Sequence, residues 1–533
     1  MVKLVSQLRW LLTIPATLFI LLTLPAFAQV TAFKQAVAEA AAGDEAIASF
    51  YLERGFEPIW TGPDRDDRKR RQALLEAATA AGNHGLPTAE YDPRDIKARI
   101  RAARTADELG QLEVYLTSVF LNYARDVQTG VLIPSNVDSE IVRTVPYRDR
   151  HATLIAFSKS SASGFMKALP PKSPEYTRLM RQKRELERLL VGGGWGPTVS
   201  GGKLEPGDTG PSVVSLRDRL VAMGFLERTN NQAYDARLEA AVTAFQEAHG
   251  LVADGIAGVG TLAELNKSPA DRLGQVLVAM ERERWINKPL GERHIWVNLT
   301  DFSAKIMDHG QVTFQTRSVI GAHDEDRRSP EFSDEMDHMV INPSWYVPRS
   351  IATKEYLPQL RANPNAVSHL EITDRRGRVV NRASADFAGY TAQNFPYNMR
   401  QPPSRRNALG LVKFMFPNKW NIYLHDTPAK NLFSRDVRAF SHGCIRLNDP
   451  FDFAYALLAE QEADPEGYFQ SILRTGQERR VDIEQPVPVH LVYRTAFTTP
   501  TGHMNYRRDV YGRDARIWSA LQREGVVLSA LGG

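Results

Sequence analysis

Two short stretches of the sequence carry most of the information about the fold and its chemistry. They read YLHDTP at residues 423–428 and SHGCIRL at residues 441–447. The first stretch alternates as a strand would, which places Tyr423 and His425 on one face, about 6–7 Å apart along it. The second stretch holds Cys444, the only cysteine of the chain. A base and an aromatic hydroxyl on one strand face, with a lone thiol downstream, predict a nucleophilic site.

Cys444 has the neighbours that a catalytic thiol needs. A free thiol with a pKa of about 8.5 is only a few per cent thiolate at neutral pH, so an imidazole that takes its proton raises the reactive fraction. Gly443 removes a side chain where a substrate carbonyl must approach, and the amides around Gly443 and Cys444 can donate to a developing oxyanion. Arg446 is a permanent cation suited to a substrate carboxylate. We therefore predict that Cys444 is the nucleophile and His425 its base.

The sequence around this site has the pattern of a β-rich domain. Apolar residues alternate over residues 295–299 and again over residues 312–316, with a turn at residues 308–310. Further strands are expected at residues 339–345, 410–416 and 421–425, and a helix at residues 451–461. We place the catalytic domain at residues 269–495. Its long polar, proline-containing stretch, residues 349–406, is interpreted as a capping insertion that acts as a lid or binding loop.

The rest of the chain divides into further parts, which makes the predicted fold class multidomain α+β. Residues 29–191 have helical periodicity and are expected to form a helical scaffold domain. Within them, the mixed charges of residues 64–71 indicate a solvated helix face without a function of its own. The glycine-rich residues 192–206 predict a linker, residues 207–268 hold two short helices and a turn cluster, and residues 496–533 form a C-terminal extension.

The N-terminal residues predict export. Lys3 and Arg9 precede an apolar stretch that is short for a membrane span, and Ala26-Phe27-Ala28 supplies a small-x-small cleavage signal. We expect residues 1–28 to be a signal peptide and the mature chain to be periplasmic. The alternative is an uncleaved anchor that holds the chain at the inner membrane.

The bulk composition narrows the classes of protein that the chain can represent. It has 533 residues, of which 43% are hydrophobic and 24% charged, so disorder and a multi-span membrane protein are excluded. The net charge of +4 is small for this length and indicates no nucleic-acid partner. One cysteine excludes an intramolecular disulfide and any metal site built wholly from thiolates. We expect no cofactor and no metal.

Parts of this sequence resemble two known families. Asp254-Gly255, Gly258 and Thr261 stand where similar turn residues recur in the type 1 peptidoglycan-binding module. The SHGC motif at residues 441–444, after His425, resembles the signature of the L,D-transpeptidases of the YkuD type. Together with residues 341–348 and 407–410, the chain resembles the long YcbB-like subgroup, which joins a helical scaffold, a peptidoglycan-binding module and a catalytic domain with a capping insertion.

The resemblance implies a reaction and a set of site residues. Peptidoglycan stem peptides would be the substrates: the Cys444 thiolate would attack the third residue of a stem tetrapeptide, release the terminal D-alanine and pass the acyl group to an amine of another stem. Other cell-wall synthases are possible partners, and carbapenem-type β-lactams would acylate Cys444. His425 matches the general base, Gly443, His442, Tyr423 and Ser441 would support the site, and Arg446, Trp345 and Tyr346 would bind substrate.

Four alternatives need comparison with this hypothesis. A zinc hydrolase using His425, His442 and Cys444 lacks the usual ligand motifs. A serine acyltransferase would need a Ser-x-x-Lys motif opening a helix, and the match at residues 200–203 lies in the glycine-rich linker. A non-catalytic peptidoglycan-binding scaffold would leave Cys444 unreactive. An L,D-carboxypeptidase would use the same acyl-enzyme with water as acceptor, and no motif separates it from a transpeptidase. For a transpeptidase, the sequence leaves open whether the acceptor is a second stem, a lipoprotein lysine or a free D-amino acid.

Overall fold

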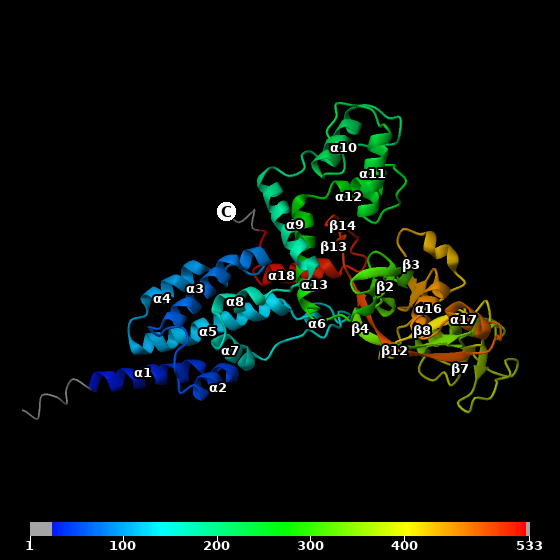
Figure 1. The fold of residues 1–533 in the computed structure, drawn as a ribbon. Coiled ribbons are helices and arrows are strands. Elements are labelled where there is room, and N and C mark those ends of the chain that lie inside the picture. Colours follow the sequence, from blue (N-terminus) through cyan, green and yellow to red (C-terminus); the bar gives the residue numbers. More distant parts are fainter. Residues whose placement is uncertain (1–23, 529–533) are drawn as a thin grey trace, which may run out of the picture. The chain divides into compact units, whose positions relative to one another are not determined.

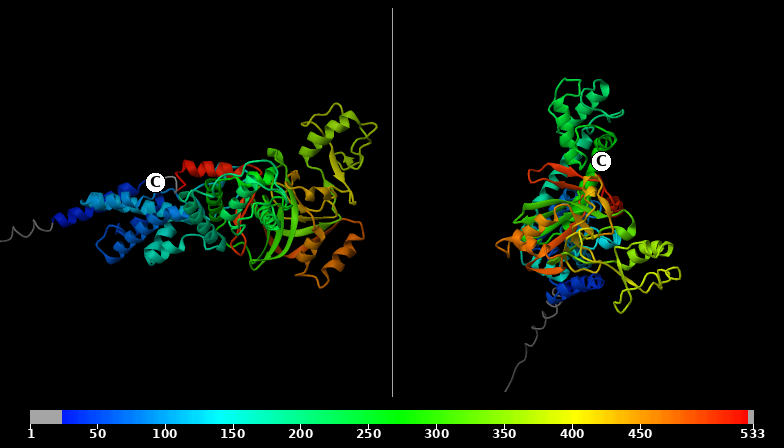
Figure 2. Two further views of the ribbon diagram at one scale, coloured as in Figure 1. Left: turned by 90° about the horizontal axis from the view of Figure 1, so that it is seen from above. Right: turned by 90° about the vertical axis from the view of Figure 1, so that its right-hand side faces the viewer.

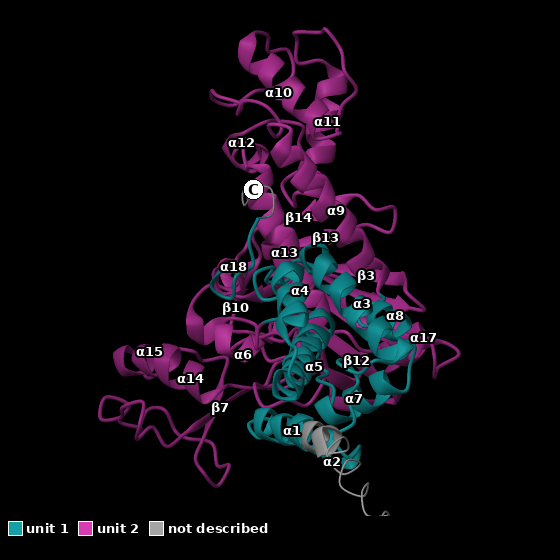
Figure 3. Cartoon of the chain, turned by 90° about the vertical axis from the view of Figure 1, so that its left-hand side faces the viewer, with its two compact units in different colours: residues 1–131, 146–172, 522–532 teal, residues 132–145, 173–521, 533 magenta. Residues whose placement is uncertain are grey.

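The structure of the chain is a computed structural model that describes residues 24–528. Its internal contacts divide it into two compact units, drawn in teal and magenta in Figure 3. The first unit combines the residues up to Val131 with Pro146–Lys172 and the residues from Gln522 onward. The second combines Leu132–Val145 with Ser173–Leu521. The chain therefore leaves the first unit and returns to it twice.

The predicted signal peptide, residues 1–28, lies outside the described residues except for its last positions, whose backbone begins α1. Among residues 24–528, no helix is both long enough and apolar enough to cross a bilayer.

The first unit is helical (Figure 1). Its elements are α1 (Leu24–Ala41), α2 (Glu45–Glu53), α3 (Arg65–Ala80), the 3₁₀ turn η1 (Ala81–His84), α4 (Pro93–Ala102), α5 (Ala106–Thr129), α7 (Arg150–Ser158) and α8 (Ala162–Ala168). Thr105 and Glu108 form a capping box at the start of α5. Glu113 on α5 is buried and accepts hydrogen bonds from the amides of Ile59 and Thr61 at 2.6 and 2.8 Å. This carboxylate holds the α2–α3 loop on α5.

The second unit begins with helical elements. These are α6 (Pro134–Val137), α9 (Pro174–Val191), α10 (Pro211–Ala222), α11 (Ala236–Ala248), α12 (Val259–Leu265) and α13 (Pro269–Trp285). Helices α10, α11 and α12 share one small core that includes Leu216, Leu238 and Phe245. Val199 and Leu204, from the stretch expected to be a linker, are buried in the same core. Single apolar residues among glycines have no periodicity, so the sequence did not distinguish them from linker residues.

A nine-stranded sheet forms the centre of the second unit. Its order is β10-β3-β11-β9-β8-β4-β12-β1-β2, and β2 also pairs with β3, which closes the sheet on itself. The strands are β1 (Arg293–Asn298), β2 (Ser303–Asp308), β3 (Gln311–Gly321), β4 (Phe332–Ile341), β8 (Val412–Met415), β9 (Leu424–His425), β10 (Ala439–Ser441), β11 (Ile445–Leu447) and β12 (Arg479–Val492). Alternate residues such as Ile295, Val297 and Leu299 are fully buried, as their periodicity predicted. The core of the sheet is continuous with buried residues of α16 and α17.

The remaining elements of the second unit surround this sheet. They are η2 (Glu325–Arg327), η4 (Lys430–Ser434), α16 (Pro450–Leu458), α17 (Pro465–Leu473), β13 (Ala496–Thr498), β14 (Met504–Tyr506) and α18 (Arg513–Arg523). The C-terminal extension is tied in by charge: Arg282 on α13 donates to Asp514 on α18 at 2.8 Å and to Glu331 at 2.6 Å, and all three are buried. Residues 496–521 of the extension are thus integral to the second unit.

The insertion between β4 and β8 is folded and has a core of its own. It contains β5 (Trp345–Tyr346), α14 (Arg349–Ile351), the π-helical turn η3 (Ala352–Tyr356), α15 (Leu357–Ala362), β6 (Glu371–Thr373) and β7 (Asn398–Gln401). The three strands pair in the order β5-β7-β6. Both views of Figure 2 show this yellow-green segment projecting from the sheet. The apolar core of the insertion includes Ile351, Leu360, Ile372, Phe387 and Phe395.

Asn407 closes the neck of the insertion. Its buried side chain donates to the carbonyl of Pro343, before the insertion, at 3.1 Å. It also donates to the carbonyls of Gln401 and Pro402, at the end of the insertion, at 3.1 and 3.0 Å. One side chain therefore holds both ends of the insertion together.

Candidate active site

Three adjacent strands place three polar side chains in one row. His425 on β9 lies opposite Lys413 on β8, and it lies beside Arg446 on β11. Residues in register on neighbouring strands face the same side of a sheet, with Cβ atoms about 5 Å apart in an antiparallel pair. The order across the sheet is therefore Lys413, His425, Arg446. The sequence predicted the histidine and the arginine but gave no signal for the lysine, because strand register is set by long-range pairing.

The orientation of the His425 ring is set by the backbone carbonyl of the next residue. The Nδ1 atom of His425 is hydrogen-bonded to the carbonyl of Asp426. Because a carbonyl oxygen only accepts, Nδ1 carries the proton, and Nε2 of the neutral ring is the proton acceptor. The ring of His425 stands edge-on to that of Tyr423, with 5.6 Å between centroids. The predicted shared face of these two residues is thus present.

The loop that carries Cys444 is held by its own residues. Gly443 has φ of +108°, a region that only glycine adopts without strain. Ser441 Oγ donates to the carbonyl of Cys444 at 2.5 Å and accepts from the amide of Gly443 at 3.1 Å. The amide of Gly443, expected to face the substrate, is therefore already used. Among residues 24–528, the amide of Cys444 has no hydrogen-bond partner, so it is free to donate to a bound oxygen.

The sulfur of Cys444 lies against the segment that enters β9. The thiol donates to the carbonyl of Asn421 at 3.4 Å. Asn421 adopts a left-handed conformation with φ of +54°, which asparagine tolerates better than most residues. Asn418 holds this turn, since its amide nitrogen donates to the carbonyl of Ile422 at 2.8 Å and its oxygen accepts from the amides of Trp420 and Ile422. The strained turn presents its carbonyl to the thiol.

Burial keeps both reacting groups neutral in the resting structure. Burial lowers the pKa of His425 to about 3, and the charges of Arg446 and Lys413 add to the effect. Burial also raises the pKa of Cys444 to about 11, although hydrogen bonds from Tyr423 and the charges of Arg446 and Lys413 oppose the rise. At neutral pH the pair is a thiol and a free imidazole rather than a preformed ion pair. A thiolate therefore forms only when a base takes the thiol proton.

A cleft of about 680 Å³ gathers the residues predicted from the sequence. Its lining includes Trp345, Tyr346, Tyr423, His425, Ser441, His442, Cys444 and Arg446, together with Lys413 and Asn421. Gly443 does not line it. Trp345 is buried, whereas the Tyr346 side chain is exposed. The cleft thus brings together all but one of the predicted site residues, from the sheet and from the insertion.

Glu355 connects the insertion to the loop of residues 441–444, which carries Cys444 and is called the catalytic loop below. It lies in the π-helical turn η3, and its carboxylate contacts His442 Nε2 at 2.5 Å and Arg327 at 3.1 Å. A second ion pair joins Lys354 to Asp326 at 2.5 Å. We call these contacts the cap latch. They account for His442 as a residue that joins the insertion to the loop, two residues before Cys444.

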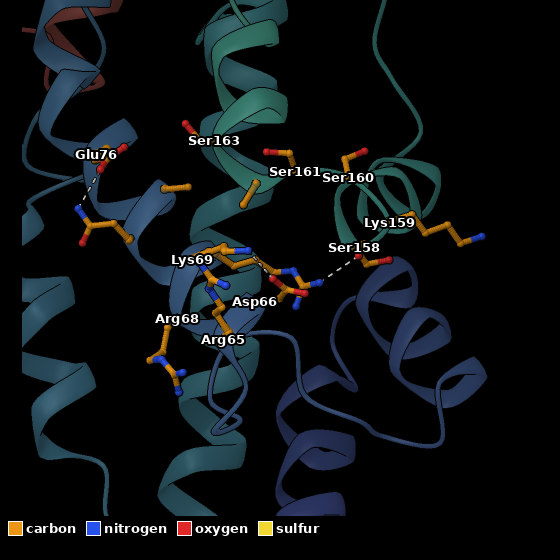
Figure 4. A pocket seen from close by; sticks show the side chains of 14 residues that line it. Arg65, Asp66, Arg68, Lys69, Glu76, Ser158, Lys159, Ser160, Ser161 and Ser163 are labelled. Carbon is orange, nitrogen blue, oxygen red and sulfur yellow. Dashed lines mark hydrogen bonds and ion pairs between the residues drawn. The ribbon is translucent and has the colours of Figure 1, made fainter.

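A second cleft, of about 720 Å³, lies in the helical unit between α3 and the start of α8. Figure 4 shows Ser160, Ser161 and Ser163 across from Arg65, Asp66 and Lys69. Lys69 pairs with Asp66 at 2.9 Å, Gln72 donates to Glu76 at 2.9 Å, and Arg70 donates to the carbonyl of Ser158 at 3.0 Å. These side chains largely satisfy one another, as a solvated helix face would. We assign this cleft no function.

Among the described residues, no group of three or more histidine, cysteine, aspartate or glutamate side chains is arranged to hold a metal ion.

Comparison with known families identifies the parts of the chain. Residues 292–477 match the L,D-transpeptidase catalytic domain family, residues 209–265 a peptidoglycan binding domain, and residues 45–182 a scaffold domain. The chain carries an L,D-transpeptidase catalytic domain. This order of scaffold, peptidoglycan-binding and catalytic domains is the one that the resemblance to the long subgroup implied.

Individual relatives extend this comparison over part of the chain. A Haemophilus influenzae protein named "Putative L,D-transpeptidase" is 32% identical over 242 residues, which is 45% of this chain and 48% of that protein. The chain thus spans about half the length of this relative. Crystal structures of L,D-transpeptidases from Xylanimonas cellulosilytica and Stackebrandtia nassauensis are 15% and 13% identical. Each match covers 56% of this chain and 100% and 96% of the respective structure, with TM-scores of 0.16 and 0.21.

Proposed function

We propose that the protein is a peptidoglycan L,D-transpeptidase that uses Cys444 as its nucleophile. The observation that carries the proposal is the placement of Cys444 and His425 in one cleft of an L,D-transpeptidase catalytic domain. The peptidoglycan binding domain supports peptidoglycan as the substrate.

The reaction begins with proton transfer. His425 Nε2 accepts the thiol proton as the Cys444 sulfur attacks the carbonyl carbon of the third stem residue. The tetrahedral intermediate collapses when the carbon–nitrogen bond to the terminal D-alanine breaks, and the imidazolium returns its proton to the leaving amine. An amine of a second stem then attacks the thioester, gives up a proton to His425 and releases the thiol.

The oxyanion of each intermediate needs donors close to Cys444. The unpartnered amide of Cys444 is one candidate, and the hydroxyl of Tyr423, which hydrogen-bonds to the sulfur, is the second. Burial, together with the neighbouring Cys444, raises the pKa of Tyr423 well above its usual value, so the phenol keeps its proton and remains a donor. Gly443 contributes its conformation, which aims the next amide.

The test is incubation of the full chain with tetrapeptide-bearing peptidoglycan, followed by mass analysis of the wall fragments. Release of D-alanine with a new bond between two third residues supports the proposal. Release of D-alanine with tripeptide products alone identifies an L,D-carboxypeptidase. No release, with intact binding to the polymer, identifies a non-catalytic scaffold.

Peptidoglycan lies outside the cytoplasm, so the proposal also requires export. The expected signal sequence at residues 1–28 supports a periplasmic location. Fractionation of cells that express the full chain, with N-terminal sequencing of the mature protein, tests both the location and cleavage after Ala28.

A further inference from the structure

Two cationic side chains flank His425, the proposed general base. Lys413 and Arg446 lie on opposite sides of His425, on strands β8 and β11. Both are half-buried, and both line the cleft. Two strand spacings of about 4.8 Å separate the backbones of the outer residues of this row. The cations therefore approach the reacting centre from different directions.

Neither cation has an acidic partner of its own. Within residues 24–528, no carboxylate lies within ion-pair distance of Lys413 or Arg446. Glu355, the acid that lines the cleft closest to the catalytic loop, is occupied by His442 and Arg327. The Nε atom of Arg446 is buried without a hydrogen-bond partner. Glu478 acts on Lys413 only at longer range, and its carboxylate accepts from the amide of Ser344 at 3.2 Å.

Partly desolvated cations without counter-charges are unfavourable, so such groups persist where they meet an anion. Burial lowers the pKa of both Lys413 and Arg446, in keeping with this cost. One available anion is the thiolate of Cys444, which acts on both side chains. A single thiolate formed during attack does not require two cations on opposite sides of the base. The other available anions are carboxylates of the substrate.

We propose, on the basis of the function given above, that Lys413 and Arg446 each bind a different carboxylate of the acyl donor. The donor would be a peptide with two carboxylates near the bond that is cleaved: one on the leaving D-residue and one on the side chain of the third residue. Lys413 is then a specificity-determining residue. The site would select an acidic donor peptide by binding one carboxylate on each side of His425.

Binding measurements in a Cys444→Ala background test this directly, because they require no turnover and contain no thiolate. Three synthetic tetrapeptides serve as probes: one with both carboxylates free, one with the leaving residue as carboxamide, and one with the side-chain carboxylate of the third residue as carboxamide. Their Kd values are measured by calorimetry on the full chain with Cys444→Ala alone and with Lys413→Met, Lys413→Arg or Arg446→Met added. Lys419→Met is the matched control, since Lys419 is exposed, lies outside the cleft and loses the same charge.

We expect each substituted cation to affect the binding of one carboxylate only. With Cys444→Ala alone, each carboxamide should weaken binding by about tenfold or more, the usual worth of a charge-assisted contact. Lys413→Met should bind the dicarboxylate probe and one of the carboxamide probes equally well, and Arg446→Met should do the same for the other carboxamide probe. Lys413→Arg and Lys419→Met should still bind the dicarboxylate probe more tightly than either carboxamide.

Three results would overturn the inference. These are loss of discrimination at the same carboxylate in both variants, equal weakening of all three probes, and no binding of any probe. None of these depends on acyl transfer. A failure of the proposed function, seen as absence of D-alanine release by the unmodified chain, is therefore distinguishable from a failure of this inference.

Discussion

The sheet and the insertion face the same cleft but are built differently. The sheet positions Lys413, His425 and Arg446 through strand register, and its strands share one large buried core. The insertion contributes a wall through strands of two to four residues, short helical turns and a smaller core. The cap latch joins it to η2 through Arg327 and Asp326 and to the loop that carries Cys444 through His442, at partly exposed side chains. The proposed nucleophile and base thus lie on the part that a large core fixes, whereas the insertion is held to that part by charged side chains.

The strongest test of this division removes the nucleophile. Cys444→Ala should abolish acyl transfer and carbapenem adduct formation, while the thermal unfolding midpoint changes little, because one half-buried thiol contributes little packing. Intact-mass analysis after carbapenem treatment checks it. An adduct that persists in this variant would move the reactive group elsewhere, and loss of folding would give the thiol a structural role.

Loss of the base should have the next largest effect. His425→Ala is expected to lower the rate of acyl transfer by about 10²-fold or more, the usual worth of a positioned acid–base group. His442→Ala removes only a latch contact and should cost much less. Turnover of a tetrapeptide donor by the two variants gives the comparison, and the reverse order would exchange the roles of the two histidines.

The pH dependence of alkylation tests the neutral resting state. With the pKa of Cys444 raised to about 11, the thiolate fraction rises about tenfold per pH unit below that value. Iodoacetamide labelling of the free protein should therefore accelerate about a hundredfold between pH 7 and pH 9. Labelling that is already at its plateau near pH 7 would instead indicate a preformed thiolate.

Replacement of residues 349–406 by a short Gly-Ser linker should separate recognition from chemistry. We expect cross-linking of polymeric peptidoglycan to fall by about tenfold or more, with carbapenem acylation of Cys444 changed by less than about threefold, because only the large substrate needs the second wall. Wall-fragment analysis and intact mass report the two activities. Equal losses would make the insertion structural, and unchanged cross-linking would remove it from recognition.

The smallest expected effect concerns the cap latch. Glu355→Gln keeps the size of the side chain but removes the charge that His442 and Arg327 share, so turnover of polymeric substrate should change by only about two- to fivefold. Glu371→Gln is the matched control, because Glu371 pairs with Arg400 within the insertion at 3.0 Å and away from the catalytic loop. Equal effects of the two substitutions would contradict a specific latch.

Local patterns were sufficient to predict the elements that hold the site. The alternation at residues 295–299 corresponds to β1, and the helix expected at residues 451–461 corresponds to α16. The SHGC motif and His425 pointed to residues that the structure gathers in one cleft. Such features depend on residues that are close in sequence, so a local sequence pattern is enough to predict them.

Features set by long-range contacts were not predictable from the sequence. Lys413 enters the site only through the register between β8 and β9, and Glu355 only through the approach of η3 to the catalytic loop. The insertion was interpreted from its polar residues and prolines, whereas irregularly spaced Leu360, Phe387 and Phe395 give it a core. Because these apolar residues follow no period, no local rule assigns them to one cluster.

The closed neck at Asn407 has a consequence for how this catalytic domain can diversify. One side chain joins Pro343 to Gln401 and Pro402, so the two ends of the insertion leave the sheet side by side. The insertion is therefore attached like a short hairpin, whatever the length of the segment between its ends. The entropy of closing a longer loop grows only slowly with its length. Segments of other sizes and sequences can therefore be exchanged between these anchor points without altering strand register, and the neck makes the insertion a replaceable module on a constant catalytic frame.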